Sequence, residues 1–242
     1  MTTFTVGYFV GSLAKASINR KLAVALTRLA PPTLHFREIP IGDLPLYSYD
    51  YDAAYPPAGK ALKDAIASVD AVLFVTPEYN RSIPGALKNA IDWASRPWGT
   101  NSFARKPSAI IGASTGKIGT AVGQQHLRSI LAFCNSPLMN AIEAYLQFTP
   151  GLITDDGEVT ADSTREFLAN FMNEFHGYIT RVYTALPRTS AALRARSRCA
   201  RGGVRDARRH PPPSCSALAA PRARFHRETN STSLGRRTRR RC

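Results

Sequence analysis

Short apolar runs alternate with amphipathic stretches along most of the chain. Five runs are too short for helices and predict strands; they cover residues 4–10, 34–39, 71–75, 108–112 and 138–145. Between them apolar residues recur at helical spacing, which predicts helices over 17–29, 60–68, 84–95, 119–133 and 162–182. Strands and helices that alternate in this way are typical of an α/β domain, in which helices cover both faces of a parallel sheet.

The clearest strand–loop–helix unit spans residues 71–93. Its strand, 71–75, is apolar throughout, as expected of a parallel strand buried on both faces. Pro84 suits the first position of the following helix, whose apolar face includes Leu87 and Ile91. The polar loop between the two therefore lies at the carboxyl end of a buried strand, where open α/β sheets bind ligands.

A second polar loop follows the first strand and has the features of a phosphate site. Gly11 permits close approach of the backbone, Ser12 and Ser17 carry hydroxyls, Lys15 carries a positive charge and Asn19 an amide. The free N–H groups at the start of the next helix add partial positive charge. Ser17 could instead serve only as the helix cap, an alternative that this loop alone leaves open.

Motif spacing narrows the kind of nucleotide that this loop would bind. Neither the Gly-x-Gly-x-x-Gly fingerprint nor the Walker A motif occurs here, which favours a mononucleotide. A third loop, 113–119, is rich in small residues and follows the fourth strand. With strand order 2-1-3-4-5, the loops after strands 1, 3 and 4 converge on one crevice.

These motifs resemble those of the NAD(P)H-dependent FMN reductase family, which includes quinone and chromate reductases. The resemblance rests on Gly11-Ser12-Leu13, Ser17-x-Asn19-Arg20, the segment 77–80 and the block 84–93, and it covers residues 4–183 in order. It implies a flavodoxin-like doubly wound sheet of five parallel strands in the order 2-1-3-4-5. It also implies tightly bound FMN, NAD(P)H as co-substrate, and a homodimer or homotetramer with the flavin near a subunit boundary.

The resemblance also implies the residues that contact FMN. Those for the phosphate loop are Gly11, Ser12, Lys15, Ser17, Ile18 and Asn19, and those for the ring and the rest of the pocket are Pro77, Glu78, Tyr79, Asn80, Ser114 and Gly116. Relatives often carry Arg where this chain has Lys15, and Lys cannot form the same two-pronged phosphate contact.

The implied reaction needs few catalytic side chains, because the flavin itself carries the redox chemistry. Hydride would pass from nicotinamide to the flavin and two electrons then to a quinone, flavin, azo compound or chromate, which predicts ping-pong kinetics. The loop 78–80 would serve through its backbone N–H groups, with the Glu78 carboxylate as a structural acceptor rather than a base. His126 is interpreted as a surface or interface residue, and no metal site is indicated.

Positive charge is concentrated at the end of the chain. Residues 187–242 hold 16 of the 32 basic residues but only Asp206 and Glu228 as acids, so the rest of the chain is near neutral. We therefore expect a folded domain over 1–186 and a disordered Arg- and Pro-rich tail over 187–242. Non-specific nucleic-acid or acidic-partner binding by this tail, and a flavodoxin-like electron carrier without an NAD(P)H site, are the two alternative functions.

Cysteine usage and hydropathy indicate where the protein works. Cys134 is the one cysteine in residues 1–186 and looks like a small core residue. No run approaches the roughly 18 apolar residues of a membrane helix, and the first residues lack the basic region of a secretory signal. The sequence therefore predicts a cytoplasmic protein with no membrane contact.

Overall fold

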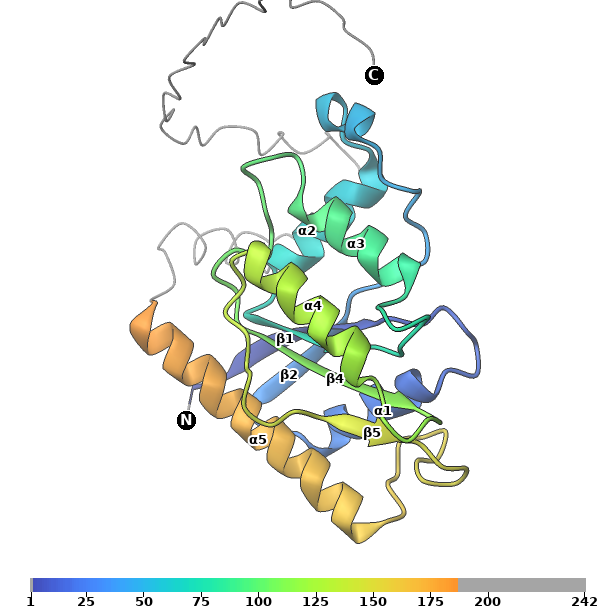
Figure 1. Ribbon diagram of the computed structural model, residues 1–242. Helices are drawn as coiled ribbons and strands as arrows, with labels where there is room; N and C mark the ends of the chain where they lie inside the picture. The colour runs from blue at the N-terminus through green and yellow to red at the C-terminus, as the bar shows by residue number, and fades with distance from the viewer. Residues whose placement is uncertain (1, 187–242) are drawn as a thin grey trace, which may run out of the picture. The chain divides into compact units, whose positions relative to one another are not determined.

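The computed structural model describes residues 2–186, which form a five-stranded parallel sheet with helices on both faces (Figure 1). The strands are β1 (Phe4–Val10), β2 (Leu34–Glu38), β3 (Ala71–Val75), β4 (Ser108–Ser114) and β5 (Tyr145–Gln147). They are ordered β2-β1-β3-β4-β5, and each neighbouring pair is parallel. The predicted doubly wound, flavodoxin-like order is confirmed.

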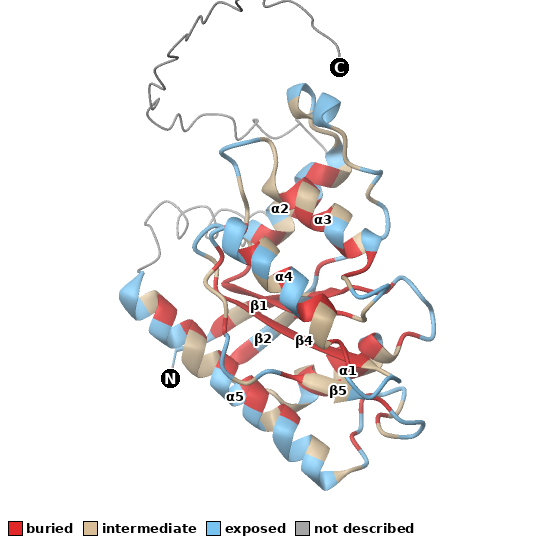
Figure 2. Ribbon diagram, viewed as in Figure 1, coloured by how far each residue is buried: buried red, intermediate tan, exposed pale blue. Residues whose placement is uncertain are grey.

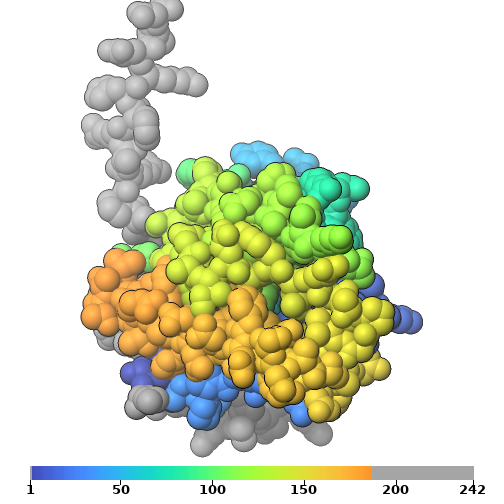
Figure 3. Space-filling view, turned by 60° about the horizontal axis from the view of Figure 1, so that its bottom comes forward, coloured from blue at the N-terminus to red at the C-terminus, as the bar shows by residue number. Residues whose placement is uncertain are grey.

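The helices divide between the two faces of the sheet. They are α1 (Ile18–Leu29), α2 (Pro57–Ala67), α3 (Gly85–Ser95), α4 (Ala121–Phe133) and α5 (Asp162–Ala185), with a short 3₁₀ helix, η1 (Tyr49–Ala53). Helices α1 and α5 share one apolar cluster with the sheet, whereas α2, α3 and α4 share the other. Figure 3 shows α5 and the segment before it along one face of the domain.

The core follows the alternation of side chains along the strands. All five residues of β3 are buried, and buried residues concentrate on the sheet and on the helix faces that cover it (Figure 2). Leu73 and Val75 belong to the cluster of α1 and α5, while Val72 and Phe74 belong to the cluster of the opposite helices. Cys134 lies in the second cluster, where burial and then the nearby Asp92 raise the pKa of its thiol. This supports its interpretation as a core residue.

The last strand differs from its predicted position. The apolar run 138–145 predicted one strand, but Leu138 forms only an isolated bridge to Ser108 at the start of β4, and β5 begins at Tyr145. Ile142 lies between these two contacts with a φ of 48°, a left-handed conformation that interrupts an extended strand. The chain thus touches both ends of β4 with a turn in between.

A short helix and the start of another differ from the sequence prediction. The sequence pattern did not predict η1, and it placed the start of α2 three residues too late, at Lys60 rather than Pro57.

The tail 187–242 lies outside the described residues, so its predicted disorder stays a prediction. Among the described helices, none combines the length and the apolar character required to cross a bilayer.

Candidate functional site

The carboxyl ends of β1, β3 and β4 lie side by side at one edge of the sheet. Val10 pairs with Val75, and Val75 pairs with Ile111, so β1 and β3 end at the same level, and β4 continues past it to Ser114. The three loops that the sequence singled out follow these strand ends directly. The structure therefore brings them to one edge, at the point where the strand order reverses between β1 and β3.

The first loop leaves β1 through a very close approach to β3. The Gly11 N–H donates to the Val75 carbonyl oxygen at 2.8 Å. A Cβ on Gly11 would lie 2.5 Å from Thr76 Oγ1, so a larger residue would push the two loops apart. Ser12 is buried, and its Oγ accepts a hydrogen bond from the Ala14 N–H at 3.3 Å. This hydrogen bond helps to shape the loop and keeps the Ser12 hydroxyl close to the loop backbone.

Helix α1 begins at this loop with its positive end free of acidic side chains. Ser17 is the N-cap, and its Oγ accepts from the Arg20 N–H at 3.3 Å, so the capping role is present. Ile18 is the first helical residue and is half-buried, whereas Lys15 is exposed. With no acid in the first turn, the helix end and Lys15 together favour an anion.

Asn19 has a role that the sequence did not reveal. It is buried, its Nδ2 donates to the Ala113 carbonyl oxygen at 2.9 Å, and its Oδ1 accepts from the Ala113 N–H at 2.9 Å. This double pairing joins the first turn of α1 to β4, beneath the first and third loops. One hydrogen of the Nδ2 group is used here, so the predicted phosphate contact through the other stays a prediction.

The second loop ends in a tight turn after Pro77. Tyr79 and Ser82 exchange two backbone hydrogen bonds of 2.9 Å, and the two residues between them, Asn80 and Arg81, have φ values of 51° and 63°. Two consecutive left-handed residues are typical of a type I′ turn, a conformation that costs more for Arg than for Asn. The turn uses the Tyr79 N–H internally, while the N–H groups of Glu78 and Asn80 make no hydrogen bond among the described residues.

The Glu78 side chain serves the protein's own structure. Its Oε2 accepts from the Gly123 N–H in the first turn of α4 at 2.9 Å, and its carboxylate is 8% exposed. Thr120, the N-cap of α4, makes no side-chain capping bond, so Glu78 supplies that cap from another loop. The expected structural role of the carboxylate is confirmed, and Arg81 contacts its other oxygen at 3.5 Å.

The third loop is held at Ser114 by one local hydrogen bond and one to the segment after β5. Ser114 Oγ accepts from the Gly116 N–H at 3.2 Å, and the Ser114 carbonyl oxygen accepts from Phe148 N–H at 2.8 Å. Gly119 has a φ of 58°, and a Cβ there would lie 2.8 Å from the Tyr145 carbonyl carbon. The loop can therefore turn closely over the start of β5 only with glycine at this position.

Each of the three loops also exposes one large apolar side chain. Leu13 is 59% exposed, Tyr79 50% and Ile118 50%. Sequence reasoning assigned Tyr79 to the ring but gave no role to Leu13 or Ile118. The sequence did contain a signal for them, because each is an apolar residue within an otherwise polar loop at the ligand edge. An exposed apolar side chain at such a place indicates a binding surface.

Together these features define an α/β flavoprotein site of the flavodoxin-like class. The residues present fit FMN: one loop offers a helix N-terminus and a lysine to a phosphate, and the other two offer apolar side chains to a flat ring. The second loop also offers to the polar edge of the ring two N–H groups that have no partner within residues 2–186.

Comparison with known proteins identifies the family. Residues 4–150 match the model of the NADPH-dependent FMN reductases. A 2-hydroxy-1,4-benzoquinone reductase of Burkholderia sp. is 47% identical over 174 residues, which cover 72% of this chain and 95% of that protein. An NAD(P)H-dependent FMN reductase of Pseudomonas aeruginosa is 38% identical, with 71% and 93% covered.

A solved structure agrees with this assignment. The flavoenzyme NAD(P)H:(acceptor) oxidoreductase FerB of Paracoccus denitrificans is 46% identical, with a TM-score of 0.71, and the match covers 74% of this chain and 98% of that one. The chain belongs to the NADPH-dependent FMN reductase family. Membership makes FMN its cofactor and a reduced nicotinamide dinucleotide its electron donor, as the resemblance implied.

Proposed function

We propose that the protein is an FMN-dependent NAD(P)H oxidoreductase whose physiological acceptors are quinones. The observation that carries this is the convergence, at one sheet edge, of a phosphate-type loop and two loops with exposed apolar side chains, one of which also has N–H groups without a partner among the described residues. Relatives named as quinone reductases, among them one from Pseudomonas putida at 46% identity, support this choice of acceptor. When bound, the flavin supplies the redox chemistry.

The side chains and backbone of this chain would then hold and tune the cofactor. Lys15, Ser12 and the first turn of α1 hold the phosphate, and Ser114 and Gly116 complete the pocket. Pro77 and Tyr79, together with Leu13 and Ile118, form the apolar surroundings of the ring.

Negative charge that develops on the reduced ring would be stabilised by backbone donors. The N–H groups of Glu78 and Asn80 are available for this, whereas that of Tyr79 is used in the turn. Because Glu78 caps α4, its carboxylate fixes this loop instead of exchanging protons. No side chain is assigned as an acid or base.

The proposal includes assembly and location. We place the active form as a homodimer or homotetramer in the cytoplasm, where reduced nicotinamide dinucleotides are available. Light scattering coupled to gel filtration measures the assembly, and a monomer at micromolar concentration would contradict it.

Loading with FMN and steady-state kinetics test the function. We expect a yellow protein that oxidises NADPH when a benzoquinone is added, with parallel lines in double-reciprocal plots, as a ping-pong mechanism requires. Intersecting lines would contradict alternating use of one ring face. A yellow protein that accepts electrons from a partner reductase but never from NADPH would instead be an electron carrier.

A further inference from the structure

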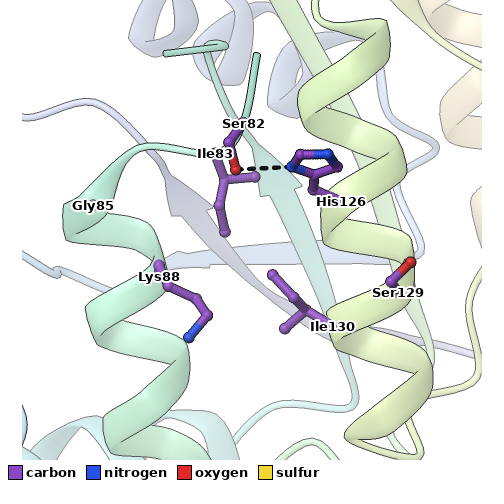
Figure 4. A pocket seen from close by; sticks show the side chains of 7 residues that line it. All are labelled: Ser82, Ile83, Gly85, Lys88, His126, Ser129 and Ile130. Atoms are coloured by element: carbon purple, nitrogen blue, oxygen red, sulfur yellow. Dashed lines mark hydrogen bonds between the residues drawn. The ribbon is translucent and has the colours of Figure 1, made fainter. Parts of the chain in front are cut away.

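The first and second loops are each supported by neighbouring elements of the fold. The second loop is held from α4, where Glu78 caps the helix and His126 Nδ1 lies 3.0 Å from Ser82 Oγ, beside the Tyr79 turn (Figure 4). Ser82 and His126 belong to the lining of a cleft between α3 and α4, together with Ile83, Gly85, Lys88, Ser129 and Ile130. The support of the first loop lies on the other face of the sheet, at the start of α1.

Three consecutive side chains in the first turn of α1 contact three different parts of the fold. Asn19 pairs with the backbone of β4. Arg20 Nη1 donates to both carboxylate oxygens of Glu38, at 3.0 and 2.9 Å. Lys21 Nζ lies 2.6 Å from Asp155 Oδ1, in the segment after β5. Because successive helical residues point about 100° apart, these contacts hold the turn from three directions.

The charges in this turn are the reverse of the usual pattern. The helix dipole favours acidic residues at the start of a helix and basic residues at its end. The first turn of α1 contains no acid and instead carries Arg20 and Lys21, whose acidic partners, Glu38 and Asp155, lie outside the helix. These positive charges do not favour the helix itself, which indicates that they serve another role.

Glu38, the partner of Arg20, is the last residue of β2 and is fixed to the sheet. Tyr8 of β1 pairs with Glu38 across the two strands, and the Tyr8 hydroxyl donates to Glu38 Oε2 at 3.4 Å. The residue after Glu38 still donates its N–H to the Tyr8 carbonyl oxygen, at 2.9 Å. The carboxylate that receives Arg20 therefore has a defined place at the carboxyl edge of the sheet.

The chain that follows β2 also reaches the first loop. A Cβ on Gly42 would lie 3.7 Å from Leu13 Cδ2, so this segment contacts the exposed apolar side chain of that loop. The end of β2 and the residues after it thus touch the first loop at Leu13 and the following helix at Arg20. None of the three loops includes this segment.

The pair of Arg20 and Glu38 contributes geometry more than stability. The two side chains are 44% and 35% exposed, and such pairs add little to the free energy of folding. The N–H groups at the start of a helix, however, bind an anion only when they point at it. A contact that sets the direction of this turn can therefore affect phosphate affinity more than it affects the fold.

We propose that Arg20 and Glu38 are positioning residues of the FMN phosphate site. Their pair sets the direction of the first turn of α1 and, with it, the direction of the N–H groups that receive the phosphate. The end of β2 is thereby a fourth element of the site, in addition to the three loops. The inference needs only the cofactor and not the electron acceptor, so it does not depend on the proposed function.

Titration of the FMN-free protein with FMN and with riboflavin, which lacks the phosphate, tests this role without turnover. Arg20→Gln should weaken FMN binding about fivefold, near the upper limit for an exposed pair, and riboflavin binding by less than about twofold. Arg20→Lys retains a charged donor and should recover most of the FMN affinity. Arg28→Gln breaks an exposed pair with Asp156 at the other end of the same helix and should leave both affinities unchanged.

Glu38→Ala separates positioning from a direct effect of charge. If Arg20 acts through Glu38, this variant should weaken FMN binding as much as Arg20→Gln does. If Arg20 instead attracts the phosphate by its charge alone, removal of the competing carboxylate should strengthen FMN binding. The phosphorus NMR resonance of bound FMN should shift in both variants and stay constant in Arg28→Gln. Equal losses for FMN and riboflavin, unchanged FMN affinity in either variant, or stronger binding by Glu38→Ala overturns the inference.

Discussion

The two edges of the sheet are built in opposite ways. At the amino edge, buried Asp70 accepts from the Thr5 N–H at 2.8 Å through Oδ2, and its own N–H donates to the Thr5 carbonyl oxygen at 2.6 Å. Tyr183 of α5 donates to the Asp70 carbonyl oxygen, and Lys106 Nζ donates to that of Val69 at 2.6 Å. At the carboxyl edge, by contrast, the N–H groups of Glu78 and Asn80 make no hydrogen bond to any residue that the structure describes, and each loop exposes an apolar side chain.

This contrast separates stability from function within one sheet. Groups at the amino edge are satisfied by the protein itself, so they lower the free energy of the fold and have little left for a ligand. At the carboxyl edge, the N–H groups of Glu78 and Asn80 have no partner within residues 2–186 and are available to a ligand. Substitutions at the amino edge should therefore affect the free energy of unfolding, and those at the carboxyl edge should affect cofactor affinity. Substitution of Asn19 should affect both quantities.

Asn19→Ala should have the largest effect. It leaves the buried N–H and carbonyl of Ala113 without their partners, which we expect to cost about 2 to 5 kcal/mol of unfolding free energy. FMN affinity should fall as well, because α1 loses its link to β4. Urea titration with and without FMN measures both effects. Gln125→Ala, at an exposed site, is the control; a loss below about 1 kcal/mol for Asn19→Ala would contradict the clamp.

Asp70→Ala should destabilise the fold without affecting the ligand site. Loss of a buried charged acceptor from the Thr5 N–H should cost about 2 to 3 kcal/mol. The folded fraction should bind FMN with wild-type affinity, as measured by fluorescence quenching at low temperature. A large drop in FMN affinity here would break the separation between the two edges.

Lys15→Gln should have the converse effect. We expect FMN to bind about tenfold more weakly, equivalent to about 1.4 kcal/mol, while the unfolding free energy of the FMN-free protein changes by less than about 0.5 kcal/mol. Wild-type affinity should also fall more steeply with salt than that of the variant. Lys15→Arg retains the charge and serves as the matched control; equal salt slopes in all three proteins would exclude a phosphate contact.

The smallest predicted effect is a dependence of stability on pH that arises near the carboxyl-terminal end of α3. Burial, followed by nearby Tyr47 and Asp52, raises the pKa of Tyr55, whose hydroxyl donates to the Trp93 carbonyl oxygen. Because the folded state holds this proton more tightly, stability should fall as pH rises above about 10, where unfolded tyrosine ionises. Tyr55→Phe should lose less of its stability between pH 9 and 11. Identical pH slopes in urea titrations would contradict this.

The sequence predicted the parallel sheet and the three loops, because hydrophobic periodicity and strand–loop–helix order are local properties of the chain. The strand order, which is not local, was implied by the resemblance to a known family. It did not reveal the partners of Asn19 or Glu78. Asn19 meets Ala113, 94 residues away, and Glu78 meets Gly123, 45 residues away. A polar residue beside a ligand loop looks the same in sequence whether it faces the ligand or a buried backbone group, so only the fold distinguishes the two.

The same reason explains the wrong prediction for the last strand. Residues 138–145 have a uniform apolar pattern, which cannot show that Ile142 turns the chain between two contacts with β4. Lys88 and His126 lie on helices that the pattern predicted correctly, but their common cleft depends on how those helices pack. Element type was thus predictable, whereas contacts between elements were not.

The pairing of Asn19 with Ala113 also has a mechanical consequence. It ties the first turn of α1 to β4, so the loop before α1 and the loop after β4 are fixed to the same rigid part of the domain. A cofactor held by both of these loops would not be released by displacement of either one while the clamp is intact. Its release requires either the breaking of this clamp or movement of the Tyr79 turn, which makes that turn the expected gate for slow cofactor exchange.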